Sequence, residues 1–363
     1  MMAARLDRCR RLLDGLHVDG LLFTDPVDIR YLSGFRGDDA TLVVGHGAAL
    51  LCTDARFWGQ VHEEVSGFEL SKVTSEPLLT HSAREAARVL GEGARLGYQG
   101  GQLSHASYRR LRRLHRGGLR DVRQSVTLLR AIKDEAEIAL MRRAAAIADE
   151  ALHLVVSRGL VGRTERDVAW DLQAEYHRLG ADGEAFGAIV ATGDHGAQAH
   201  ALPRDRVIRA GELVVVDTGA RADGYCSDIT RTFAAGEPAE ELRVIYAAVL
   251  KAQLAGLAAV RAGAHGRGDV DAAARAVIED AGYGERFGHG TGHGVGLQVH
   301  EAPSLGRTRG DRLEKGMVCT VEPGIYVEGL VGVRIEDTVL VTADGAERLT
   351  THPKELQVVD WPT

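Results

Sequence analysis

The sequence predicts an α+β protein of two domains, and three observations lead to this fold class. A length of 363 residues exceeds what one hydrophobic core usually holds. The pattern changes near Val126, where short strands mixed with helices give way to a long helix. Strand-like runs in the second part alternate apolar and polar residues, which is typical of antiparallel strands. We therefore expect a smaller α/β domain over residues 1–125 and a larger α+β domain over residues 126–363.

The first domain is expected to combine short strands with helices. Strands are predicted over 20–25, 40–45 and 48–54, and the GHG turn joins the last two as a hairpin. Helical patterns follow at HSAREAARVLGE and SHASYRRLRRLH. From Tyr108 to Arg123, leucines spaced among arginines predict a solvated amphipathic helix followed by a turn, with a docking patch as the alternative.

The second domain is expected to begin with a helix over Lys133–Val156, which has acids in its first turn and one apolar stripe. A second helix opens at Thr164 with a capping box and ends at Gly180. Two further helices are predicted over 239–260 and 268–282. The strand-like runs GELVVVD, YCSDITRTF, GMVCTVE and VGVRIEDTVLV lie between and after these helices.

Two of these runs share a pattern. Gly211 precedes Asp217 by six residues, Gly316 precedes Glu322 by six, and each run leads through a turn to another strand with an acid. This match predicts two strand pairs in a pseudo-twofold arrangement, with acids from both halves meeting at its axis. Chance similarity of two short strands is the alternative.

Charge, cysteine content and hydropathy narrow the classes of function. The chain has 44 Lys and Arg against 51 Asp and Glu, a net charge of −7, without the concentrated basic face that nucleic acid requires. Its four cysteines are far apart, which is typical of buried thiols in a reducing compartment. No stretch approaches the ~20 apolar residues of a membrane span, and the N-terminus has no apolar core of secretory length. We expect a cytoplasmic protein with no nucleic-acid or membrane partner.

Asp217 and Asp228 form the first pair of acids. The Asp223-Gly224 dipeptide predicts a two-residue hairpin turn that places Gly219 opposite Asp228. The two carboxylates are then diagonal neighbours, about 7–8 Å apart at the backbone. Two like charges so close on an apolar strand are costly unless a cation lies between them. The alternative is one aspartate in solvent and one that caps the turn.

Glu322 and Glu336 form the second pair. Glu322 ends the apolar run MVCTVE, and Pro323 stops the strand behind it. Glu336 alternates with apolar residues and shares a face with Arg334, but a salt bridge to Arg334 accounts for one acid only. Four carboxylates and an imidazole suit two divalent ions, Mn(II) or Co(II), with Zn(II) also compatible. Such a pair of ions indicates metal-assisted hydrolysis.

The segment FGHGTGHGVGLQVHE places three histidines among many glycines. This glycine density excludes a stable helix, and no strand-to-helix unit surrounds the segment as a phosphate loop would require. In an extended chain His289 and His293 point the same way. Together with His300, they favour site chemistry beside the predicted carboxylate cluster over the ordinary role of polar residues with satisfied hydrogen bonds.

These motifs resemble the pita-bread metallopeptidases, and within them the prolidase and aminopeptidase P branch. Asp217 and Asp228, GHGVG, VHE, EPG and RIED follow in that family's order and spacing, and DPVDIRYLSGF is similar to its creatinase-type N-terminal domain. The resemblance covers nearly the whole chain. It implies a creatinase-type N-terminal domain over residues 1–125 and a pita-bread catalytic domain over residues 126–363.

The resemblance also implies roles for individual residues. The metal ligands would be Asp217, Asp228, His293, Glu322 and Glu336, with Asp228 and Glu336 bridging two ions. Glu322 would also shuttle a proton, and Arg334 resembles an arginine that pairs with an acid or with the substrate. His300 corresponds to a histidine on the substrate side, and His289 to the one that lies four residues before the metal histidine.

His200 matches a family histidine that stabilises the tetrahedral intermediate. It lies seventeen residues before Asp217, but its context QAHALPRDRVI departs from the usual one, with Ala199 before the histidine. The following DRVI supports the assignment, and His195 in TGDHG competes for the role.

The activity implied by the resemblance is hydrolysis of the bond between an N-terminal residue and proline, by a homodimer acting on proline-containing dipeptides or short peptides. Dipeptidase (prolidase) activity is preferred, and Xaa-Pro aminopeptidase activity on longer peptides is the alternative. A metal-free pita-bread binding protein is the remote alternative, because such proteins lose ligands and this chain has all five.

Overall fold

The computed structural model describes residues 2–359, and the chain divides into two compact units, Met1–Arg130 and Ala131–Thr363. The division therefore follows residue 130, whereas the sequence places it after residue 125. All four cysteines are free and buried, as the sequence predicts. Each unit is described by itself below.

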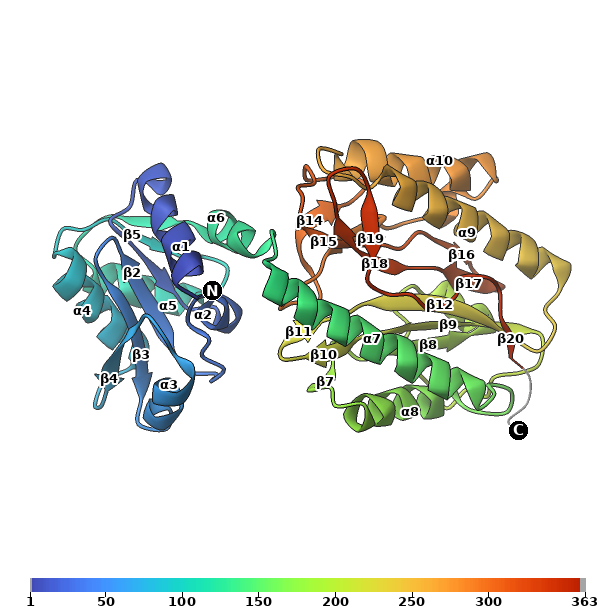
Figure 1. The fold of residues 1–363 in the computed structure, drawn as a ribbon, viewed down its shortest axis with the longest axis horizontal. Coiled ribbons are helices and arrows are strands. Elements are labelled where there is room, and N and C mark those ends of the chain that lie inside the picture. Colours follow the sequence, from blue (N-terminus) through green and yellow to red (C-terminus); the bar gives the residue numbers. More distant parts are fainter. Residues whose placement is uncertain (1, 360–363) are drawn as a thin grey trace. The chain divides into compact units, whose positions relative to one another are not determined.

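The first unit is built on a six-stranded mixed sheet in the order β4-β3-β2-β1-β5-β6 (Figure 1). Its strands are β1 (Gly20–Phe23), β2 (Thr41–Gly45), β3 (Ala49–Asp54), β4 (Glu69–Val73), β5 (Leu96–Tyr98) and β6 (Leu119–Asp121). Its helices are α1 (Met2–Leu16), α2 (Pro26–Ser33), α3 (Trp58–Glu64), α4 (Leu78–Leu90), α5 (His105–Leu114) and α6 (Arg123–Thr127), with a 3-10 turn at Leu128–Arg130.

Two predictions for this unit can be compared with the structure. The hairpin is confirmed, because β2 and β3 pair antiparallel around the GHG turn. The turn expected after α5 is wrong in part, because Leu119–Asp121 forms the edge strand β6. This short strand pairs in parallel with β5, and that long-range pairing has no signature in the local pattern.

The helices of the second unit follow the predicted ranges closely. They are α7 (Glu135–Ser157), α8 (Glu165–Arg178), α9 (Glu240–Ala259) and α10 (Ala272–Asp280), with a π-helical turn at Gly266–Asp271 before α10 and 3-10 turns at Gly193–Ala197 (η2) and Gly284–Arg286 (η4). Asp134 and Thr164 close capping boxes at the starts of α7 and α8, so the start predicted at Thr164 is confirmed. In Figure 1, α9 and α10 lie side by side, and α7 runs across the strands toward α8.

Helix α9 corrects one expectation. It has 20 residues, including an 18-residue window with a mean hydropathy of 1.4, and is long and apolar enough to cross a membrane by length and composition alone. The sequence had been expected to hold no such stretch. In the structure α9 packs along α10, and its inner face is buried with residues such as Ile245 and Val249 in the core shared with β17. Packing of this face in a protein core therefore accounts for part of the apolar composition, since 33% of the window is buried.

The strands of the second unit form two principal sheets and two small ones. The principal sheets have the orders β20-β12-β9-β8 and β14-β13-β15-β18-β19, and the small ones are β11-β10-β7 and β16-β17. The strands are β7 (Gly183–Glu184), β8 (Ile189–Thr192), β9 (Glu212–Thr218), β10 (Ala220–Ala222), β11 (Tyr225–Cys226), β12 (Ile229–Ala235), β13 (Gly292–Gly294), β14 (Glu301–Leu305), β15 (Val318–Val321), β16 (Gly324–Val327), β17 (Val331–Arg334), β18 (Asp337–Val341), β19 (Ala346–Arg348) and β20 (Val358–Val359).

Two antiparallel pairs, β9 with β12 and β15 with β18, repeat one design. Gly211 and Gly316 precede these pairs with φ of 87° and 90°, and each donates its N–H to the end of the return strand. Such φ values suit glycine because a side chain would be strained there. The repeated glycine, strand and return strand agree with the predicted pseudo-twofold pattern.

The run VGVRIEDTVLV is divided where one strand was expected. β17 ends at Arg334 and β18 begins at Asp337, so Glu336 lies at the junction of two sheets. Its N–H donates to the Thr230 carbonyl at 3.0 Å, and its carbonyl accepts from Arg231, so β12 takes its backbone hydrogen bonds. The alternating pattern could not reveal this break because both strands keep the same period.

Candidate active site

All nine side chains singled out from the sequence line one cavity of about 350 Å³ in the second unit. They are His200, Asp217, Asp228, His289, His293, His300, Glu322, Arg334 and Glu336. Apolar side chains, including Phe186, Ile189 and Val299, complete the lining. The structure therefore brings together residues that are up to 136 positions apart in the chain, between His200 and Glu336.

The first acid pair has the geometry that its turn predicts. Ala222 pairs with Tyr225 around Asp223-Gly224, and the same register pairs Thr218 with Ile229. Asp217 lies opposite Thr230, so Asp217 and Asp228 are diagonal neighbours as expected. Both carboxylates are buried, with relative exposures of 9% and 4%. The alternative of a solvent-exposed aspartate is therefore wrong.

The second acid pair is arranged differently. Val321 pairs with Asp337 in β15 and β18, and Gly324 pairs with Arg334 in β16 and β17. Both pairings have one register, which places Glu322 directly opposite Glu336 between the two ladders. Thr230 from the first half donates its hydroxyl to Glu336 Oε2 at 2.7 Å, so the halves are joined at this carboxylate.

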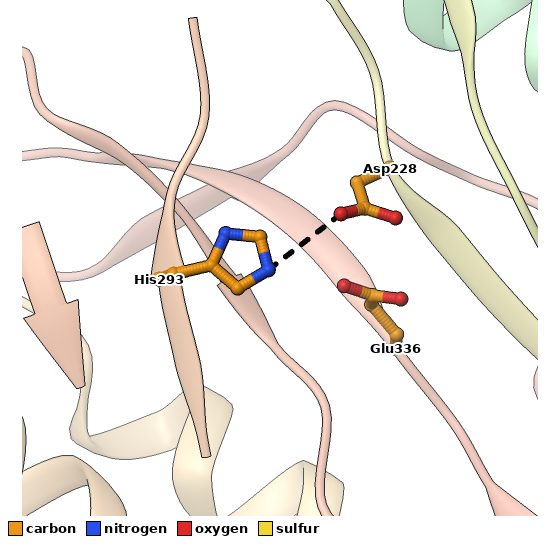
Figure 2. Close-up of side chains that lie close together, drawn as sticks. All are labelled: Asp228, His293 and Glu336. Atoms are coloured by element: carbon orange, nitrogen blue, oxygen red, sulfur yellow. Dashed lines mark ion pairs between the residues drawn. The ribbon is translucent and has the colours of Figure 1, made fainter. Parts of the chain in front are cut away.

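His293 connects the acids of the two halves. Figure 2 shows its imidazole directed at Asp228, with Glu336 beside them. His293 Nε2 lies 3.7 Å from Asp228 Oδ2 and 3.2 Å from Glu322 Oε1, while its Nδ1 bonds the Gly294 carbonyl. Donor atoms of Asp228, His293 and Glu336 all lie within 4.8 Å of one another, close enough to hold a metal ion. Fixing Nδ1 on a backbone carbonyl leaves Nε2 for the ion.

Two carboxylate oxygens support the fit of a cation. Asp217 Oδ1 and Glu336 Oε1 are buried and have no hydrogen-bond partner among residues 2–359. An unpaired buried carboxylate oxygen is costly, and a bound cation removes that cost. The donor set of four carboxylates and one imidazole therefore fits divalent metal ions.

The electrostatics of the acids reflect burial and crowding. Burial, followed by the charges of neighbouring acids, raises the pKa of Asp228 and of Glu336 well above their ordinary values. Burial alone would also raise the pKa of Glu322, but the hydrogen bond and charge of His293 lower it to about 2. In return, although burial opposes the change, Glu322 raises the pKa of His293 to about 9.

The Arg334 guanidinium donates to four protein acceptors. It donates to Asp217 Oδ2 at 2.5 Å, to Thr230 Oγ1 at 3.1 Å, to the Tyr326 hydroxyl at 2.8 Å and to the Ala199 carbonyl at 3.3 Å. This arrangement favours pairing with an acid over pairing with substrate. Tyr326, which also bonds His289 Nε2 at 2.9 Å, was missed from the sequence because a tyrosine in an apolar strand gives no distinguishing signal.

The glycine-rich segment is held by a buried ion pair. Arg275 makes two bonds to Asp271 and donates to the carbonyls of Phe287 and His289. Asp271 in turn accepts from the N–H and hydroxyl of Thr291, whose carbonyl accepts from the Glu322 N–H. The ion pair thus holds the part of the segment that precedes the short strand β13. From the sequence, Asp271 and Arg275 are expected only as part of the helix over 268–282.

His200 and His195 are separated by the structure. His200 lines the cavity, whereas His195 is 3% exposed, does not line it, and bonds Glu165 through Nδ1 at 2.8 Å. His195, which competed with His200 for the role at the site, therefore lies in the same loop but does not line the cavity.

Two models of known protein families match this chain. Residues 139–343 match the metallopeptidase family M24, and residues 5–132 match the creatinase/prolidase N-terminal domain. The chain belongs to metallopeptidase family M24. The resemblance drawn from the motifs is confirmed, and so is the fold of a creatinase-type domain followed by a pita-bread domain. The chain is thus a metallopeptidase, and its family implies divalent metal ions.

Three relatives cover nearly the whole chain. An Xaa-Pro dipeptidase from Pyrococcus furiosus is 35% identical, covering 98% of this chain and 100% of that protein. The solved Xaa-Pro dipeptidase from Bacillus anthracis superposes with a TM-score of 0.95 at 38% identity, covering 99% and 100%. The X-Pro aminopeptidase from Thermotoga maritima superposes with a TM-score of 0.88 at 34% identity, covering 97% and 100%.

Proposed function

We propose that this M24 metallopeptidase is an Xaa-Pro dipeptidase that binds two divalent metal ions. The observation that carries the proposal is the single cavity lined by all nine side chains, five of them suited to metal. Its volume of about 350 Å³ lies near the lower end of the roughly 300–1,000 Å³ range of ligand sites, which suits a dipeptide.

The metal ions would be held by Asp217, Asp228, His293, Glu322 and Glu336. Carboxylate oxygens in the majority favour Mn(II) or Co(II), and Zn(II) is compatible with the same donors. When bound, such ions activate water and polarise a carbonyl. The two unpartnered carboxylate oxygens within the described chain support this assignment.

The remaining chemistry belongs to side chains of the cavity. Glu322 carries a proton to the departing proline nitrogen, because its carboxylate lies at the wall of the cavity that would hold the substrate. His200 and His300 donate hydrogen bonds to the oxyanion that develops on the scissile carbonyl. Burial, and then the charge of His293, lowers the pKa of His300, which keeps its ring neutral with one N–H to donate.

Substrate positioning is assigned to the rest of the cavity. His289, whose pKa is lowered mainly by burial, faces the substrate as a neutral ring, and Arg334 fixes Asp217 beside it. An imide bond has no N–H to offer, so proline is recognised by shape. The apolar walls of Phe186, Ile189 and Val299 supply a surface for its ring.

An Xaa-Pro aminopeptidase is the second candidate, supported by the similarity to the Thermotoga maritima X-Pro aminopeptidase. Hydrolysis of Ala-Pro and of Ala-Pro-Ala, each after reconstitution with Mn(II), separates the two. We expect cleavage of Ala-Pro. Cleavage of the tripeptide alone would assign aminopeptidase activity.

The metal-free binding protein named from the sequence disagrees with the membership of a metallopeptidase family. Elemental analysis after Mn(II) reconstitution should find two ions per chain, and one ion or fewer would overturn the proposed dinuclear site. We also propose, from the family resemblance, a cytoplasmic homodimer. Light scattering of the purified protein measures its oligomeric state.

A further inference from the structure

A buried carboxylate lies behind the loop that carries His200. Glu165 is the first residue of α8 and has no exposed surface. It accepts the N–H of Thr192 at 2.9 Å, the N–H of Arg204 at 3.0 Å, and His195 Nδ1 at 2.8 and 3.0 Å. One carboxylate therefore satisfies three donors of a single loop.

These three donors bracket His200 in the chain. Thr192 ends β8, His195 lies in the 3-10 turn η2, and Arg204 follows His200 by four residues. The loop between them has short turns but no strand or α-helix of its own. Both of its ends are thus tied to one point on α8.

The opposite side of the loop is held by the site. Arg334 donates to the carbonyl of Ala199, the residue before His200, at 3.3 Å. Gly196 packs directly on Gly332 of β17, where a side-chain carbon on Gly332 would lie 1.7 Å from the Gly196 carbonyl oxygen. The loop is therefore fixed between Glu165 on one side and the strand of Arg334 on the other.

The His200 ring depends on this support. In the part of the chain that the structure describes, no hydrogen bond holds its imidazole, although the ring lines the cavity. The backbone that carries it therefore determines which part of the cavity the ring can reach. A shift of about 1 Å in a catalytic group can reduce turnover about 100-fold, so support of the backbone has a direct effect on rate.

We propose that Glu165 is a positioning residue for His200, acting through the loop 192–204. The inference rests on the proposed function and deepens it. His195, the competitor suggested by the sequence, belongs to the support: its Nδ1 carries a hydrogen that Glu165 accepts, and its Nε2 has no partner within residues 2–359.

The chemistry requires a carboxylate at this position. A glutamine at 165 has a single acceptor oxygen, and its amide N–H₂ would face donors. Glu165→Gln therefore leaves at least one of the three loop donors unpaired and buried, without a change in side-chain size. Glu175→Gln is the matched control, because Glu175 lies on the same helix, is buried in ion pairs with Arg158 and Arg178, and is not bonded to the loop.

The kinetic experiment compares both variants with the wild-type protein on Ala-Pro after Mn(II) reconstitution. Glu165→Gln should lower kcat by about 10–100-fold, with KM changed less than threefold and the metal content unchanged. Glu175→Gln should stay within twofold of wild type. Glu165→Asp keeps the charge and shortens the reach, so it should give an intermediate loss and remain informative if the glutamine variant fails to fold.

A double-mutant cycle tests whether the effect acts through His200. In a His200→Ala background, Glu165→Gln should lower kcat less than a further twofold, because there is no ring left to misplace. Losses that multiply in the double variant would overturn the inference and assign Glu165 a role in folding alone.

A readout without activity separates this inference from the proposed function. Ring signals of labelled histidines, with His200 assigned by its loss in His200→Ala, should shift in metal-free Glu165→Gln and not in Glu175→Gln. The amides of Thr192 and Arg204 should exchange faster in the same variant. Unchanged His200 signals would overturn the positioning role, whether or not the wild-type protein hydrolyses Ala-Pro, while an inactive wild type with shifted signals would overturn only the proposed function.

Discussion

The two halves of the second unit share one strand design and differ in how they place and balance their acids. In both, a glycine with positive φ starts a strand whose acid lies six residues on. A two-residue hairpin sets Asp217 diagonal to Asp228, whereas Glu322 lies directly opposite Glu336. Two geometries thus deliver four carboxylates to one cavity.

The charge partners differ more than the strands. Asp217 pairs with Arg334, a permanent cation, while Glu322 pairs with His293, whose charge depends on a proton. In the metal-free protein, the positive charge beside Asp217 is therefore fixed, whereas the positive charge beside Glu322 changes with pH.

Removal of His293 should have the largest effect on this comparison, because it takes away the one imidazole among the five proposed metal ligands. His293→Ala should lose bound metal and lower Mn(II)-supported hydrolysis of Ala-Pro by more than the roughly 10–100-fold typical of lost supporting residues. His300→Ala is the control, since its ring lies 4.2 Å from that of His293 but outside the cluster. That variant should retain metal and lose turnover, as elemental analysis and kcat will show; equal loss of metal from both would contradict the division of roles.

The pH dependence of metal binding should follow the protonation of His293, the histidine paired with Glu322 of the second half. With a pKa of about 9, His293 is protonated at neutral pH in the metal-free protein and must release that proton to bind an ion. Affinity for Mn(II) should therefore rise with pH, about 100-fold between pH 6 and 8 for one proton. Calorimetry in two buffers of different ionisation enthalpy measures the number of protons released when Mn(II) binds. A binding enthalpy that is the same in both buffers would refute the release of a proton.

The stability of the metal-free protein should follow the same ion pair. The raised pKa of His293 adds stability that is complete below pH 6.5 and is lost as the pH rises through about 9. The lowered pKa of Glu322 adds stability that is complete above pH 4.5 and is lost as the pH falls through about 2. Denaturant midpoints of His293→Ala should show less of this pH dependence than those of wild type.

Loss of the Tyr326 hydroxyl should have a moderate effect, because that group joins Arg334 of the fixed pair to His289 on the second half. Tyr326→Phe should lower kcat/KM by about tenfold, the value of one lost hydrogen bond to a charged group. Tyr246→Phe removes a buried hydroxyl that bonds the Lys354 carbonyl outside the cavity, and it should keep full activity. Equal activity of the two variants would show that the tyrosine does not link the halves.

The equivalent glycines should show the smallest effects. Gly211→Ala and Gly316→Ala should each destabilise the protein by about 1–2 kcal/mol, because both have positive φ. Gly316→Ala should cost more, since its added carbon would lie 3.1 Å from Ile132, against 3.7 Å from Glu237 for Gly211→Ala. Gly345→Ala, where the added carbon meets open space, should change stability by less than about 1 kcal/mol. Chemical denaturation measures all three.

Local signals explain which features were predictable. The Asp223-Gly224 turn set the register that makes Asp217 and Asp228 neighbours, because the length of a two-residue turn determines which residues of its two strands pair. Asp167 marked the start of α8 through its capping box with Thr164. By contrast, Tyr326 and Glu165 carried no signal, since the bond of Tyr326 to His289 spans 37 residues and the bonds of Glu165 to Thr192 and Arg204 span 27 and 39 residues.

The sequence by itself determined the two-part α+β fold, the four acids, the histidine segment and the family, because turns, periodicity and motif spacing are local properties. Only the tertiary structure decided that Glu322 faces Glu336 and that the strand of Glu336 breaks between two sheets. It likewise decided that Arg334 is bound to Asp217 and that His195 supports the loop of His200 from behind. These features depend on pairings between distant strands and on buried polar groups finding partners, and such contacts exist only once the core is closed.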